Sequence, residues 1–169
     1  MSIQIELQDY AGRKITFDEL SKRAKRILVK QTKERCWEVL NEGAINVRNN
    51  IIQGMRNSPP TGKLYFRGMR SVKGKTKPVF HRASSPGNYP RVDSGGLVQS
   101  IHMSRGIDEI EVGSRITSPA YPVFLEKGTD TMEARPWLEP SFDKEELKIK
   151  RRLQMVLRRA ASDYVRGNK

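Results

Sequence analysis

The sequence predicts an α+β domain in which a long N-terminal helix and a C-terminal helix pack on a small antiparallel β-sheet, with a long basic loop. Apolar residues recur every three or four positions over 18–56 and over 139–165, the spacing of a helix with one buried face. Short alternating segments between them predict strands. The 169 residues suggest one domain over 1–169, and because only 36% are hydrophobic, part of it is expected to be extension rather than core.

An N-terminal hairpin is expected over residues 1–17. Ile3, Ile5 and Leu7 alternate with polar residues, and Ile15 and Phe17 resume the alternation. The stretch 9–12, Asp-Tyr-Ala-Gly, supplies turn residues between the two runs.

The first helix is expected to end at 57–60, Asn-Ser-Pro-Pro, because proline disfavours helical geometry in the residue before it. Its apolar stripe consists of Leu20, Ala24, Ile27, Leu28, Trp37, Leu40, Ala44, Val47, Ile51 and Met55. The stripe of the second helix consists of Phe142, Ile149, Leu153, Val156, Leu157, Ala160 and Tyr164. Lysines and arginines occupy many of the other positions of both helices, which predicts solvated outer faces.

Antiparallel strands are predicted between the helices, at 97–103 and 108–113, with a turn at Arg105-Gly106. The apolar cluster at 121–126, Tyr-Pro-Val-Phe-Leu-Glu, is expected at the edge of this sheet.

Residues 57–91 differ from the rest of the chain, because they contain five prolines and no Asp or Glu. A run of this length exceeds an ordinary connection, so it is interpreted as a protruding basic loop that is mobile alone and ordered by a partner, with a short strand around 78–81 left open. Its cations are Lys63, Arg67, Arg70, Lys73, Lys75, Lys77, Arg82 and Arg91. Its apolar members, expected to anchor a partner, are Leu64, Tyr65, Phe66, Met69 and Phe80.

The formal net charge of +13 implies an anionic neighbour, which is nucleic acid, an acidic protein surface or a membrane. No stretch resembles a signal peptide or is apolar enough to span a bilayer, so synthesis in the cytoplasm and no membrane partner are expected. The single cysteine, Cys36, excludes an intrachain disulfide and is interpreted as a small core residue.

Catalytic and metal chemistry are weakly supported by the residues. Asp93 and Glu126 are the candidate pair of catalytic carboxylates, but turn and edge structure explains them better. His81, His102 and Cys36 match no familiar metal-ligand spacing, and no phosphate-binding loop or nucleophile elbow occurs. We therefore expect no enzyme activity, no catalytic or metal-binding residue and no cofactor.

Three motifs follow the basic loop: Pro-Arg-Val-Asp-Ser-Gly-Gly-Leu from 90, Tyr-Pro-Val-Phe-Leu-Glu-Lys-Gly-Thr from 121, and Ala-Arg-Pro-Trp-Leu-Glu-Pro from 134. In the first, Asp93 and Ser94 are expected to accept hydrogen bonds from turn amides, with Gly95 or Gly96 at positive φ. In the second, Glu126 is expected to bond the amides of the Gly-Thr turn that follows it. The motif residues are Asp93, Ser94, Gly95, Leu97, Tyr121, Glu126, Gly128, Thr129, Pro136, Trp137 and Leu138.

The three motifs, in this order and between two helices, resemble the neck and tail-completion proteins of tailed bacteriophages over about residues 18–165. That family shows Thr, Ala and Phe where this chain has Ser94, Pro122 and Trp137. The resemblance implies a structural virion protein at the head–tail interface, made in the host cytoplasm. It also implies a homo-oligomeric ring, expected to be a hexamer, that contacts a head-closure or connector protein and a tail terminator or tail tube protein.

Two alternatives stay open. One is a tail-terminator subunit that caps the tail tube, and the other is a basic nucleic-acid-binding protein. If the chain is a neck protein, the basic loop is expected to lie against an acidic protein neighbour, with transient contact to packaged DNA as the alternative. The residues expected to be buried are Leu97, Ile101, Phe124, Trp137 and Leu138.

Overall fold

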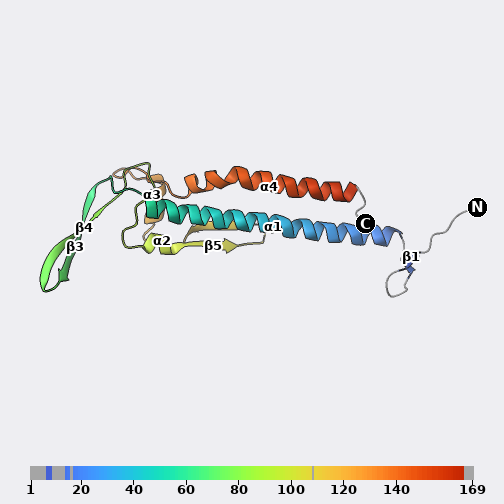
Figure 1. Ribbon diagram of the computed structural model, residues 1–169, viewed down its shortest axis with the longest axis horizontal. Coiled ribbons are helices and arrows are strands. Elements are labelled where there is room, and N and C mark those ends of the chain that lie inside the picture. Colours follow the sequence, from blue (N-terminus) through green and yellow to red (C-terminus); the bar gives the residue numbers. More distant parts are fainter. Residues whose placement is uncertain (1–6, 9–13, 16, 108, 166–169) are drawn as a thin grey trace, which may run out of the picture. The chain divides into compact units, whose positions relative to one another are not determined.

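The structure is a computed structural model that describes residues 7–8, 14–15, 17–107 and 109–165. The chain has the predicted α+β fold, with one long helix near each end and two-stranded antiparallel sheets between them (Figure 1). Two compact units are present, one formed by 1–39 with 150–169 and the other by 40–149. All features of the candidate site lie in the second unit.

Both long helices form where the apolar periodicity predicts them. Helix α1 is Phe17–Asn57 and ends directly before Ser58-Pro59-Pro60, as expected. Helix α4 is Glu139–Val165. Of the predicted N-terminal hairpin, strand β1 (Leu7–Gln8) pairs antiparallel with β2 (Lys14–Ile15), and residues 1–6, 9–13 and 16 lie outside the described part of the chain.

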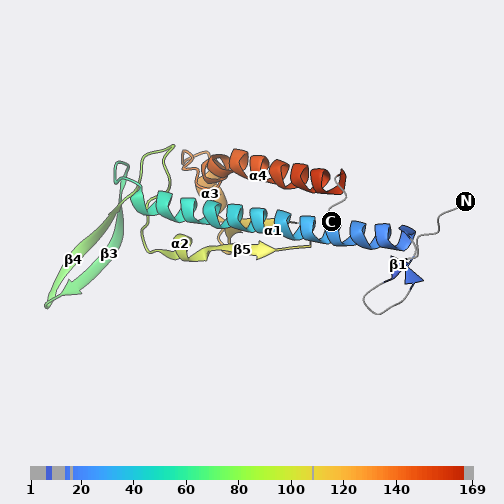
Figure 2. The ribbon, with the colours of Figure 1, turned by 45° about the vertical axis from the view of Figure 1, so that its right-hand side comes forward.

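The segment predicted as a basic loop contains a β-hairpin, which corrects the prediction for 57–91. Strand β3 (Leu64–Val72) pairs antiparallel with β4 (Lys75–Arg82), and pairing continues beyond it because Gly62 and Lys63 exchange backbone hydrogen bonds with Ala83. In both ribbon views the hairpin extends away from the end of α1 (Figures 1 and 2).

Two short helices form in the region after the hairpin where strands and a sheet edge were predicted. The segment 97–103 begins as helix α2 (Gly96–Ser100) and continues as strand β5 (Ile101–Arg105). Strand β6 (Ile110–Ser114) pairs with β5 antiparallel, in agreement with the predicted second strand. The segment 121–126, expected at the edge of the sheet, is helix α3 (Tyr121–Lys127), which Pro122 favours because its fixed φ suits the first helical turn.

The core of the second unit forms where the last turns of α1 meet β5 and the segment before α4. Its buried residues are Val47, Ile51, Met55, Ile101 and Trp137. Ile101 and Trp137 are therefore buried as predicted, and Leu97 and Leu138 are half-buried beside them. The prediction for Phe124 is wrong: it is 47% exposed, because on a helix Pro122 and Leu125 take the inward positions.

A polar contact joins α1 and the first turns of α4. The buried Glu145 carboxylate accepts hydrogen bonds from the side-chain amides of Asn46 and Asn50, both at 3.4 Å, and from Lys148 Nζ at 2.8 Å. The hydrogen bond from Lys148 is the largest cause that holds the pKa of Glu145 below 4.5, although burial opposes it. Ionised Glu145 thus stabilises the contact between the two helices.

Candidate functional site: an amphipathic hairpin and the cavity at its base

The β3–β4 hairpin reverses at Lys73-Gly74. Both residues have positive φ, 51° and 73°, as the two central residues of a type I′ turn require. This turn matches the twist of the strands it joins, and it places the Lys73 side chain at the tip of the hairpin.

A β-bulge divides the hairpin into a base and a tip. Phe66 pairs with Phe80 and Gly68 pairs with Val79, so Arg67 is an extra residue in β3. Such a bulge interrupts the strict alternation of faces along a strand. Leu64 and Phe66, below the bulge, therefore share a face with Met69 above it.

The register gives the hairpin two chemically different faces. The apolar face consists of Leu64, Phe66, Met69, Pro78 and Phe80, together with Ser71, Thr76 and Arg82. The basic face consists of Arg70, Lys75 and Lys77, together with Tyr65, Gly68, Val72, Val79 and His81. On the apolar face, the rings of Phe66 and Phe80 pack edge to face with centroids 5.7 Å apart.

Neither face is covered by the described part of the chain. Every residue of β3 and β4 except Gly68 and His81 is exposed, and Phe66 is exposed to 60%. An isolated two-stranded ribbon is marginally stable in water, and contiguous exposed apolar side chains mark interaction sites. These features are typical of a hairpin that contacts another molecule.

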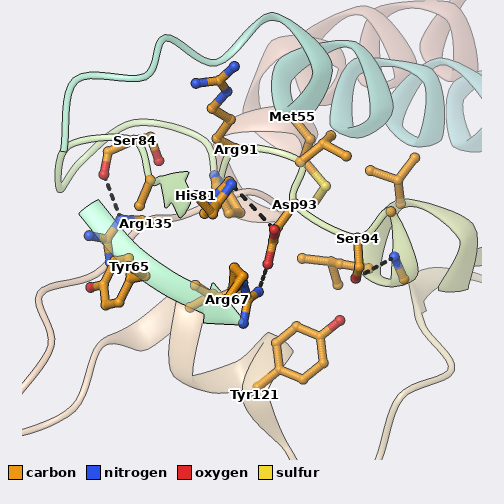
Figure 3. A pocket seen from close by; sticks show the side chains of 18 of the residues that line it. Met55, Tyr65, Arg67, His81, Ser84, Arg91, Asp93, Ser94, Tyr121 and Arg135 are labelled. Carbon is orange, nitrogen blue, oxygen red and sulfur yellow. Dashed lines mark hydrogen bonds and ion pairs between the residues drawn. The ribbon is translucent and has the colours of Figure 1, made fainter. Parts of the chain in front are cut away.

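The eight cations predicted for this segment separate into two groups. Lys63, Arg70, Lys73, Lys75, Lys77 and Arg82 are exposed on the hairpin or beside it. Arg67 and Arg91 line a cavity of about 500 Å³ at the base of the hairpin (Figure 3). The other lining residues come from the hairpin and the residues that follow it, the end of α1, the 90–98 segment, α3 and the segment before α4.

Asp93 fastens the base of the hairpin to the first motif, a role that corrects the prediction that it bonds turn amides. The Arg67 guanidinium forms an ion pair with one Asp93 oxygen, and His81 Nδ1 lies 3.4 Å from the other (Figure 3). Burial, followed by repulsion from Arg67 and Arg91, holds the pKa of His81 below 6.5, so the imidazole is neutral at neutral pH. The bulge at Arg67 is what directs this guanidinium towards Asp93.

The rest of the first motif forms the expected turn. Ser94 Oγ accepts a hydrogen bond of 3.4 Å from the Gly96 amide, and Gly95 has φ 86° directly before α2. Leu97 and Tyr121 line the cavity, and burial raises the pKa of the Tyr121 hydroxyl above 10.0.

Glu126 joins the second motif to the third, and this corrects the expectation that it bonds the amides of the Gly-Thr turn. Its Oε2 accepts hydrogen bonds from the amides of Trp137 and Leu138, at 2.7 and 2.9 Å, and its Oε1 accepts one from Glu139 at 3.0 Å. These amides stand at the N-terminus of α4, where backbone N–H groups lack helical partners and negative charge is favourable. The Glu126 side chain thus caps α4 from α3.

The remaining motif residues shape the connection between α3 and α4. Gly128 has φ 77°, and a Cβ there would meet the Met132 carbonyl oxygen at 2.9 Å, so only glycine fits. Thr129 pairs with Met132 in an isolated β-bridge. Pro136 leads into Trp137, whose Nε1 donates to the Pro122 carbonyl at 3.1 Å and so ties the third motif to α3.

Sequence reasoning missed two residues of the cavity, Arg135 and Ser84. Both are buried, and Arg135 Nε donates a hydrogen bond of 2.9 Å to the Ser84 carbonyl oxygen. Arg135 lies within the third motif, but its position there gave no signal that its charge would be buried.

The residues considered for metal binding or catalysis are not brought together as a set. His102 Nδ1 contacts the Gly113 carbonyl at 3.1 Å across the β5–β6 pair, while His81 contacts Asp93. Among the residues that the structure describes, no group of three His, Cys, Asp or Glu side chains could hold a metal ion. Within the same residues, no helix combines the length and apolar character needed to cross a bilayer.

Comparison with known proteins gave no relative: no protein-family model, no curated protein and no solved structure matches this chain.

Proposed function

We propose that this protein is a structural subunit of a tailed-phage neck that joins the head-closure complex to the tail as a member of a homo-oligomeric ring. The observation that carries the proposal is the β3–β4 hairpin, whose apolar and basic faces are both exposed. The resemblance of the three motifs supports it, and so does the capping of the third motif by Glu126 of the second.

The hairpin is the element we assign to contact with a neighbouring subunit. Its apolar face offers aromatic and aliphatic side chains, including the Phe66–Phe80 pair, of the kind that forms the centre of protein interfaces. The basic face and the tip carry four cations, Arg70, Lys73, Lys75 and Lys77, which match an acidic neighbour and direct its approach.

A second candidate function is nucleic-acid binding, favoured by the same four cations. A two-stranded β-ribbon fits the major groove of duplex DNA, and its lysines and arginines would contact phosphates. The apolar face weighs against duplex binding, because contacts to phosphates and to the groove need no exposed aromatic pair. The two functions separate in a salt titration: DNA affinity would fall steeply with salt concentration, independently of base sequence.

The test is genetic and uses a phage that encodes this chain. An amber mutation in its gene should yield filled heads and separate tails in electron micrographs, and the wild-type gene supplied in trans should restore joined particles. A triple variant, Lys73→Glu with Lys75→Glu and Lys77→Glu, should fold but fail to restore joining.

The matched control makes the same charge change at three exposed lysines outside the hairpin. These are Lys25, Lys30 and Lys127. The control should restore infectious particles, whereas equal yields from both variants would contradict the assigned contact. Imaging of the restored virion separates the neck position from a terminator that caps the tail tube.

A further inference from the structure

Arg135 carries a charge that the described part of the chain does not balance. The residue is 7% exposed, and its Nε donates to the Ser84 carbonyl. Within the described residues, no carboxylate forms an ion pair with its guanidinium, and its terminal N–H groups have no protein partner. These nitrogens are not among the fully buried unpaired atoms, so they face accessible space. A mostly buried charge is costly unless it is paired, and these donors are free to bind an anion that enters the cavity.

Ser84, the neighbour of Arg135, also has an unmatched group. Its side chain is fully buried, and its hydroxyl has no hydrogen-bond partner among the described residues. Both Ser84 and Arg135 line the cavity at the base of the hairpin (Figure 3). The hydroxyl is closed off from accessible space in the structure, so it can donate to an acceptor bound by Arg135 only when its side chain rotates towards the cavity.

The other lining residues define the rest of the ligand. Asp93 is the one acidic residue among the described residues that line the cavity, and its carboxylate already contacts Arg67 and His81. Arg67 and Arg91 add positive charge near the cavity, while much of the remaining wall is apolar. This wall includes Met55, Val92, Leu97, Val98, Leu125 and Met132.

We propose that this cavity binds a carboxylate attached to an apolar group, with Arg135 and Ser84 holding the carboxylate. Its volume of about 500 Å³ suits such a ligand, because ligand pockets span roughly 300–1,000 Å³. A guanidinium matches a carboxylate with two parallel hydrogen bonds. A phosphate dianion would need more donors and would be repelled more strongly by Asp93. The carboxylate comes either from the end of a polypeptide chain or from a small organic acid.

The binding experiment titrates the full-length protein by calorimetry with three probes: N-acetyl-leucine, N-acetyl-leucinamide and methyl phosphate. N-acetyl-leucine supplies the carboxylate and an apolar side chain, and N-acetyl-leucinamide is its uncharged match. We expect a Kd for the acid in roughly the millimolar range, and about ten- to hundredfold weaker binding of the amide. Equal binding of acid and amide overturns the proposal, and so does tighter binding of methyl phosphate than of the acid.

A longer probe distinguishes the two sources of the carboxylate. Tighter binding of acetyl-Ala-Ala-Leu, with a free carboxylate, supports the site as a socket for a polypeptide end. Equal affinity for this peptide and for N-acetyl-leucine supports a small-acid site. The outcome does not depend on the phage function, because a chain that fails the genetic test can still bind the acid.

Variants assign the binding to the two residues. Arg135→Met should abolish the preference for acid over amide, and Ser84→Ala should weaken acid binding several-fold. Arg115→Met removes an exposed arginine outside the cavity lining and should leave the affinity unchanged. Unchanged acid binding by Arg135→Met overturns the site. If that variant does not fold, the thermal shift of the wild-type protein decides, since the acid must raise its Tm more than the amide does.

Discussion

Replacing Glu126 tests whether α3 caps α4 through this one carboxylate. Glu126→Ala removes three hydrogen bonds to backbone amides, and each charge-assisted bond is worth about 1.5–3 kcal/mol. Water can replace the bond to the exposed Glu139 amide, and partly the bond to half-buried Leu138, but not the bond to buried Trp137. The loss is thus about one and a half bonds, or roughly 2–4 kcal/mol of unfolding free energy.

The assay is urea unfolding followed by far-ultraviolet circular dichroism, together with a thermal scan. Each kcal/mol moves the Tm of a chain of this size by about 2–4 °C, so Glu126→Ala should lower it by roughly 5–15 °C. Glu126→Gln keeps one carbonyl acceptor without the charge, so its Tm should lie between those of the wild type and Glu126→Ala. The control is Glu133→Ala, at an exposed carboxylate. A loss for Glu126→Ala within about 0.5 kcal/mol of this control would refute the capping role.

Three further predictions concern stability and assembly. Trp137→Ala should lower the free energy of unfolding by about 3–5 kcal/mol in urea titrations, because the side chain is 4% exposed; a loss below about 1 kcal/mol would contradict its core position. The pKa of Glu145 is lower in the folded state than its ordinary value of 4.5. The stability that the ionised carboxylate contributes is therefore fully present above about pH 4.5 and is lost as the pH falls through the lower folded-state pKa. Unfolding measured from pH 7 to 3 should therefore show a smaller acid-induced loss for Glu145→Gln than for the wild type, and parallel curves would refute this. Phe66→Ser with Phe80→Ser should lower stability only slightly, by about 0.5–1.5 kcal/mol for the ring pair, but should reduce assembly into rings measured by mass photometry; unchanged assembly would remove the apolar face from the contact.

The two long helices were predictable because their signal is local and repeated. The stripe over 18–56 gave α1 within one residue at each end, and the last helix was predicted with its observed bounds. Of the β3–β4 hairpin, only a short strand around 78–81, within β4, was anticipated, because the alternation in β3 is broken. Leu64 and Phe66 are two residues apart, whereas Met69 follows Phe66 by three, since the extra Arg67 lies between them. Period-two patterning cannot recognise a strand that contains a bulge.

The candidate site was predictable only in part, for a different reason. The motif residues were identified, and the turn at Ser94-Gly95 forms as the local sequence suggests. Glu126, however, bonds amides 11 to 13 residues further along the chain rather than those of the next turn. The burial of Arg135 and Ser84 depends on how the segment before α4 meets the base of the hairpin. Contacts of this kind follow from tertiary packing, which residue type and spacing do not specify.

The bulge at Arg67 also limits how the length of the hairpin can change in evolution. Deleting Arg67 would leave Phe66 opposite Phe80 and Gly68 opposite Val79 in strict alternation, but it would remove the guanidinium that pairs with Asp93. Residues added in matched pairs beside Lys73-Gly74 would lengthen the ribbon and leave the base unchanged. Homologous hairpins should therefore differ in length at the tip and by even numbers of residues, while the spacing from Leu64 to Gly68 stays constant.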